Sequence, residues 1–189
     1  MRRLLRLCDR IDWIVLRIGY VAGVLFLVLI AVILLDVGTR GRGWISSTRL
    51  QELEWHLHAA LCFLVFASTY LQDRHVRIEV FRERWGKKTR AVVEMLGLLF
   101  LFLPMCAVVF YFSYQMALTS FIRGDASASV TGLPHRWIIR SFQPLAFLLL
   151  LLAGFSLFVR NLAVLLGISP EAPGSSSQDT VDAADDIRV

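Results

Sequence analysis

The sequence predicts an all-α membrane protein with four transmembrane helices, both termini in the cytoplasm and a disordered acidic C-terminal tail. Three observations predict it. Of the 189 residues, 57% are hydrophobic, whereas a soluble domain of this size has about 45–50% apolar residues. The apolar residues form blocks long enough to cross a bilayer core of about 30 Å, which takes roughly 20 helical residues. Lys and Arg gather in the connections between alternate blocks, as the positive-inside rule requires.

The first predicted helix covers residues 13–35. The basic residues before it and the uncharged stretch from Ile18 to Leu35 resemble a secretory signal peptide. The stretch is too long for an ordinary signal-peptide core, and no small-residue cleavage site follows it in residues 36–40. We therefore expect an uncleaved membrane helix that the glycines after residue 37 bring to an end.

The second predicted helix, 52–71, is the least apolar of the four. Its apolar part is too short to span a bilayer and reaches spanning length only with the polar residues at its start. Glu52 lies four residues before His56, and Glu54 lies four residues before His58, so each pair shares a helix face. The two pairs are about 200° apart around the helix axis. At least one pair therefore needs protein or water beside it.

Three interpretations fit this polar segment. It is an interfacial helix start with satisfied polar pairs, a contact with a partner subunit through Glu52, Glu54, Trp55 and His56, or a metal site. The metal site fits worst, because the two histidines are two residues apart, whereas the helical H-E-x-x-H zinc motif places them four apart.

The third and fourth predicted helices each contain a proline. The third covers 91–118, and Pro104 is expected to kink it. The fourth covers 135–160 and follows Pro134, which suits a first helical turn. Near its start, Arg140 lies at the same end of the bundle as Asp36, so a pair between them is conceivable.

The composition changes abruptly at residue 169. Proline, serine and acidic residues replace the apolar blocks, which predicts a disordered tail over 169–189. We therefore expect two parts, a four-helix membrane domain over 1–168 and this tail.

The connection between the second and third helices decides the orientation. It holds seven Lys and Arg residues, whereas each of the other two connections holds three. The positive-inside rule therefore places this connection and both termini in the cytoplasm. Residues 76–81 in it partly alternate between apolar and charged side chains and are expected to be extended or interfacial. At its end, Arg90 and Glu94 are four residues apart and are expected to form an interfacial ion pair.

No motif of an enzyme is present in the sequence. It has no nucleophile elbow, Walker A sequence, dinucleotide fingerprint or kinase catalytic loop, so we expect no catalytic residues. The three cysteines are isolated, and no two helices offer histidines at matching depth for haem. We therefore expect no metal and no cofactor. The basic residues flank membrane blocks, so they indicate orientation and no nucleic-acid partner.

Five segments, in this order on four helices, resemble the small, DctQ-type permease subunit of tripartite ATP-independent periplasmic (TRAP) transporters. They are residues 52–57, residues 75–80, Gly97 with Pro104, Ser120 with residues 124–127, and residues 132–140. The resemblance runs from about Arg10 to Leu166 and leaves out the acidic tail. One departure is Asp125, where we expect Glu; the negative charge is kept.

The resemblance implies a function in the bacterial inner membrane. A periplasmic solute-binding protein would capture an organic acid or a similar solute, and a large permease subunit would carry it inward by sodium symport. The small subunit would be a scaffold for the large one, and the solute and sodium sites would belong to the large subunit. The residues that we expect at the partner interface are Glu52, Glu54, Trp55, His56, His75, Arg77, Glu79, Asp125 and Arg140.

Two other functions remain open from the residues alone. One is a membrane anchor subunit of a redox complex that binds haem or quinone. The other is a small autonomous transporter or channel. The lack of a charged cluster in the middle of the apolar blocks argues against a self-sufficient transporter, because the site of such a transporter usually lies there.

Overall fold

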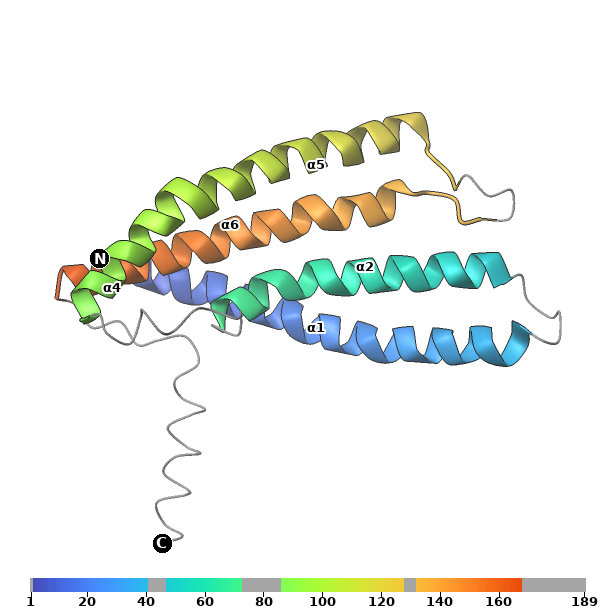
Figure 1. Ribbon diagram of the computed structural model, residues 1–189, viewed down its shortest axis with the longest axis horizontal. Coiled ribbons are helices and arrows are strands. Elements are labelled where there is room, and N and C mark those ends of the chain that lie inside the picture. Colours follow the sequence, from blue (N-terminus) through green and yellow to red (C-terminus); the bar gives the residue numbers. More distant parts are fainter. Residues whose placement is uncertain (1, 41–46, 73–85, 128–131, 168–189) are drawn as a thin grey trace, which may run out of the picture.

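The computed structural model describes residues 2–40, 47–72, 86–127 and 132–167, which are helical apart from short turns (Figure 1). The elements are α1 (Arg2–Arg40), α2 (Ser47–Leu71), α4 (Lys87–Gly97), the π-helix η1 (Leu98–Phe102), α5 (Leu103–Arg123) and α6 (Trp137–Leu165). The predicted all-α class is confirmed. The acidic tail and the segment with His75, Arg77 and Glu79 lie outside the described residues.

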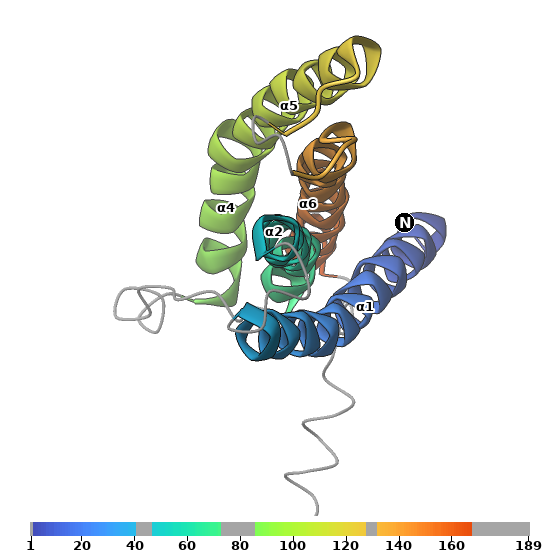
Figure 2. The same ribbon diagram turned by 90° about the vertical axis from the view of Figure 1, so that its right-hand side faces the viewer.

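The helices form two antiparallel pairs, α1 with α2 and α5 with α6 (Figure 1). Seen end-on, α5, α6, α2 and α1 follow one another in a curved row (Figure 2). Helix α6 contacts all the other helices, whereas α1 contacts only α2 and α6 to any extent. We call the end where α1 leads to α2 and α5 leads to α6 the hairpin end, and the end where α1 begins and α6 ends the terminal end.

Helix α1 buries a stripe of residues that recurs every seven positions, with Asp12 buried beside it. Cys8, Val15, Ala22, Leu29 and Asp36 follow one another at this spacing, and none is more than 5% exposed. A seven-residue period is the pattern of helices packed at a small crossing angle, as in coiled coils. The pattern starts well before the predicted helix boundary at residue 13, because residues 2–12, although rich in charge, contain no glycine or proline to stop the helix.

Small residues let the helices approach closely, as is common between membrane helices. Gly19 of α1 lies against Ser68 of α2, in space that a Cβ would occupy. Gly154 of α6 lies under the ring of Phe102, and a Cβ there would be 2.8 Å from that ring. Phe102 also stacks on Tyr70 of α2, with 4.4 Å between the ring centroids. These contacts join η1, α2 and α6 around one core, whose fully buried members are Val15, Ala67, Leu71, Cys106, Leu149, Leu150 and Ala153.

The irregularity predicted around Pro104 takes the form of the π-turn η1. The backbone N–H of Leu103 bonds to the carbonyl of Leu98, five residues back, and Pro104 then starts α5. A π-turn bends a helix locally, and Figure 1 shows α4 and α5 running as one curved helix over α6.

Within the part of the chain that the structure describes, three helical segments are long and apolar enough to cross a membrane, namely Arg3–Thr39, Lys88–Arg123 and Trp137–Leu165. Helix α2 is long enough but is not among them by composition, because its first turns are polar. The count of four membrane-spanning helices therefore stays a prediction.

Candidate functional site

The carboxylate of Glu52 joins α2 to the connection between α5 and α6 at the hairpin end. Its Oε1 accepts a hydrogen bond from the Ser127 hydroxyl. Its Oε2 accepts one from the backbone N–H of Leu133, at 2.5 Å. Gly132 makes room for this contact, because a Cβ there would lie 2.7 Å from Glu52 Oε1 and would also meet the Ser127 side chain. The glycine is thus needed for the close approach of the backbone to α2.

Backbone hydrogen bonds hold the same connection in shape. Gly124, with φ +63°, ends α5 in the left-handed conformation typical of a helix C-terminus. The N–H of Ser127 donates to the carbonyl of Leu133 at 3.2 Å, and the N–H of Arg136 donates to the carbonyl of Asp125 at 3.0 Å. Since the residues before α6 are engaged in this way, α6 starts at Trp137. Our expectation that Pro134 belongs to the first turn of the fourth helix is therefore wrong.

An ion pair lies across this connection. Arg140 Nη1 donates to Asp125 Oδ2 at 2.5 Å, and both side chains are about one-third exposed, at 28% and 31%. The partner of Arg140 is thus Asp125, fifteen residues earlier, and not Asp36. Asp36 lies in the buried seven-residue stripe of α1, where it is 1% exposed.

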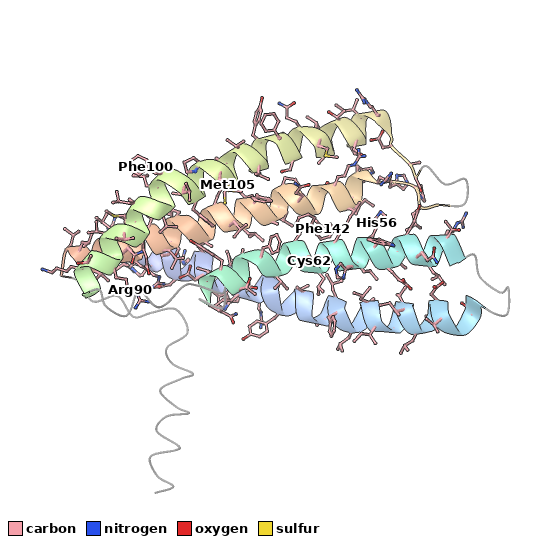
Figure 3. The ribbon with its side chains drawn as sticks, viewed as in Figure 1. His56, Cys62, Arg90, Phe100, Met105 and Phe142 are labelled. Atoms are coloured by element: carbon pink, nitrogen blue, oxygen red, sulfur yellow. The ribbon has the colours of Figure 1, made fainter. Side chains whose placement is uncertain are left out.

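The other predicted residues of α2 point in different directions. His56 Nδ1 donates to the backbone carbonyl of Glu52 at 2.5 Å, and in Figure 3 His56 lies on the side of α2 that faces α6. The side chain of Glu54 is half-buried, and its Oε1 is buried with no hydrogen-bond partner among the described residues. Trp55 is 76% exposed. Of the four candidates on this helix, Trp55 alone projects away from the bundle.

The terminal end holds an ion cluster that sequence reasoning missed. Arg160 of α6 donates from Nη2 to Asp12 Oδ2 at 2.8 Å and to Asp9 Oδ1 at 2.7 Å, and from Nε to Asp12 Oδ2 at 3.2 Å. Arg160 is 9% exposed and Asp12 3%. The signal in the sequence was the spacing of three between Asp9 and Asp12, which puts both carboxylates on one helix face. Nothing in the sequence showed that this face meets α6.

A second contact at the terminal end joins α4 to α6. The predicted ion pair is confirmed, with Arg90 Nε 3.4 Å from Glu94 Oε1. The other oxygen of Glu94 accepts a hydrogen bond from Asn161 Nδ2 at 3.3 Å. Polar contacts therefore hold both ends of the bundle, between helices at the terminal end and between helices and the α5–α6 connection at the hairpin end.

The described residues form neither a metal site nor a polar pocket of the kind that binds a solute. No three His, Cys, Asp or Glu side chains within 2–40, 47–72, 86–127 and 132–167 come together as a metal site would require. A groove of about 430 Å³ lies between α5 and α6, lined by Phe110, Tyr114, Phe121, Trp137 and Pro144 among others. These side chains are apolar or aromatic, so the groove suits lipid or a packed helix better than a polar solute.

Comparison with known proteins shows which family the chain matches. The family described as tripartite ATP-independent periplasmic transporters, DctQ component, matches residues 29–164. No curated protein and no solved structure matches the chain. The matched range contains the Glu52 contact and the Asp125–Arg140 pair. It also contains Arg160 but leaves out the carboxylates of Asp9 and Asp12.

Proposed function

The chain belongs to the DctQ family, the small membrane components of TRAP transporters, and we propose that it is the scaffold for the large permease component of such a transporter. In this role it serves sodium-coupled uptake of an organic acid or a similar solute across a bacterial inner membrane. Its partners are the large permease component and a periplasmic solute-binding protein. The family is one of transporter components, not of enzymes, and it does not favour a redox anchor.

The observation that carries the scaffold role is the way in which both ends of the bundle are held. Glu52 binds the connection between α5 and α6 at one end, and Arg160 binds the start of α1 at the other. These contacts link the first helix pair with the second, so the two pairs resist sliding past each other. A subunit that braces a moving partner needs such rigidity, whereas a subunit that carries the solute itself needs two conformations.

The proposal includes the topology. Helix α2 is the fourth membrane span, both termini are cytoplasmic and the hairpin end is periplasmic. Support comes from the packing of α2 along α1, to which it is antiparallel, and along α6, to which it is parallel (Figure 1). The seven basic residues between the end of α2 and the first turn of α4 add to it. The Glu52 contact and the Asp125–Arg140 pair then lie on the side from which the solute-binding protein approaches.

Reconstitution into proteoliposomes tests the function. Vesicles with this chain alone should take up no organic acid under an inward sodium gradient. Vesicles with this chain, the large permease component and the loaded solute-binding protein should take it up. Uptake by the chain alone would contradict the scaffold role, as would full uptake by the other two components without it.

A further inference from the structure

One face of α2 is free of contacts with the rest of the bundle. Helix α2 packs on α1 and α6 and touches η1 through Tyr70 and the α5–α6 connection through Glu52. The rest of its surface is open (Figure 2). This side faces the viewer in Figure 3, where Cys62 marks its middle. Five residues at spacings of four and three lie on it, within one narrow stripe of the helix. We call them the α2 stripe, which consists of Gln51, Trp55, His58, Cys62 and Phe66.

The α2 stripe is polar toward the hairpin end and apolar toward the middle of the bundle. Gln51, Trp55 and His58 are exposed, and Phe66 is 41% exposed. The stripe has no charged side chain. His58 Nε2 lies 3.7 Å from Cys62 Sγ, four residues along the helix. Among the described residues, Cys62 is the one hydrogen-bond partner of the His58 ring.

Lipid covers such a face poorly. His58 lies six residues beyond Glu52, which places it about 9 Å farther along the helix axis. An imidazole at that depth needs a hydrogen-bond partner, since hydrocarbon offers none. The exposed side of α1 is different, because residues 21–35 there are all apolar and need only lipid. We therefore expect another polypeptide chain, and not lipid, to cover Trp55 and His58.

The arrangement also indicates what kind of polypeptide fits. Because the stripe has no charged side chain, its partner would bind it through hydrogen bonds and not through ion pairs. A large exposed tryptophan beside a hydrogen-bonding group is typical of the residues that dominate protein interfaces. The stripe runs along α2 for sixteen residues, or about 23 Å, which is enough to accept most of a membrane helix.

We propose that the α2 stripe is the surface on which a transmembrane helix of the large permease component docks. That helix carries a side chain that hydrogen-bonds His58 and apolar side chains that pack on Cys62 and Phe66, and Trp55 fills a groove beside it. This inference rests on the proposed function and names its contact surface. It also replaces the broader set of α2 candidates from the sequence, because Glu52 and His56 bind within the chain.

Site-specific photo-crosslinking in membranes tests the surface. The chain is co-expressed with the large permease component, with p-benzoylphenylalanine in place of Trp55 or Phe66. The controls carry it in place of Leu27 of α1 or Phe112 of α5, which are each 65% exposed. We expect adducts with the large component at Trp55 and Phe66 and none at the two controls. Adducts that form only with lipid or with a second copy of this chain would overturn the inference, as would adducts of equal yield at the controls.

A second measurement addresses His58. Replacing it as His58→Leu should reduce the amount of large component that co-purifies, and His58→Gln, which keeps a hydrogen-bonding group, should restore most of it. The matched control is His135→Leu, which removes an exposed imidazole outside the helices and should change nothing. Equal co-purification of the His58→Leu and parent chains would overturn the role of His58.

The two proposals fail in different ways. If the large component co-purifies with the parent chain but crosslinks elsewhere, the α2 stripe is wrong and the scaffold function stands. If the large component never co-purifies with the parent chain, the proposed function fails and the docking surface fails with it.

Discussion

The carboxylate of Glu52 accepts the backbone N–H of Leu133 at 2.5 Å, across 81 residues of sequence. Through this one contact, the first turns of α2 hold the segment that leads into α6. The same carboxylate accepts the Ser127 hydroxyl, so a single side chain satisfies two donors in the connection between α5 and α6.

Replacing this carboxylate should loosen the hairpin end. Glu52→Leu removes both acceptors and leaves the Leu133 N–H without its partner, which is costly for a partly buried donor. We expect a lower midpoint of thermal unfolding for the detergent-purified chain. The neighbouring change Trp55→Leu serves as the control, since Trp55 is 76% exposed, and should leave the midpoint unchanged. Equal midpoints for Glu52→Leu and the parent chain would show that the contact contributes nothing to stability.

Gly132 should act through the same contact. In Gly132→Ala the new methyl group would meet Glu52 Oε1 and the Ser127 side chain, so the connection has to move away from α2. We expect Gly132→Ala and Glu52→Leu to lower the unfolding midpoint by less in combination than the sum of the two separately, because both remove one interaction. Gly97→Ala is the control, as a Cβ at Gly97 meets nothing within 4 Å. Strict additivity would separate the glycine from the Glu52 contact.

The ion cluster at the terminal end should contribute more stability than the other ion pairs. Arg160→Met leaves Asp12, 3% exposed, buried without its cation, and removal of one partner from a buried pair costs about 3–5 kcal/mol. Unfolding by a titrated denaturing detergent should show the loss. Asp12→Leu in the same chain should recover part of it, because an apolar replacement of the whole pair avoids the unpaired charge.

The control for this cluster is Arg90→Met. The Arg90–Glu94 pair lies within one helix, with the Arg90 side chain 43% exposed, and pairs of this kind contribute less than about 1 kcal/mol. If Arg160→Met lowers the free energy of unfolding by no more than Arg90→Met does, the ion cluster at the terminal end does not stabilise the bundle.

The proposed topology predicts that the start of α2 and the C-terminal tail label from opposite sides of the membrane. In a chain without its native cysteines, a cysteine at Thr48, at the start of α2, should react with a membrane-impermeant thiol reagent added to whole spheroplasts. A cysteine at Ser177 should react only after the membrane is opened. Reaction at both positions from outside would mean that the number of spans is odd and that α2 does not cross the membrane.

The sequence by itself determined the features that depend on local spacing. Apolar blocks of sufficient length predicted the helices, the spacing of four predicted the Arg90–Glu94 pair, and Pro104 predicted an irregular turn, because each follows from neighbours along one helix. The order of short segments predicted the family. The N-terminal extension of α1 was missed, because residues 2–12 carry charges that suit a flanking segment as well as a helix.

Only the tertiary structure decided which side chains meet. Arg160 and Asp12 are 148 residues apart, and periodicity along one helix carries no information about the rotation of another helix beside it. The same holds for α2. Its polar residues were evident in the sequence, but its packing against α1 and α6 turned Glu52 inward and left Trp55 and His58 on the open side. Packing sets the rotation of a helix about its own axis, and that rotation separates the residues that hold this chain together from those that are free to bind another.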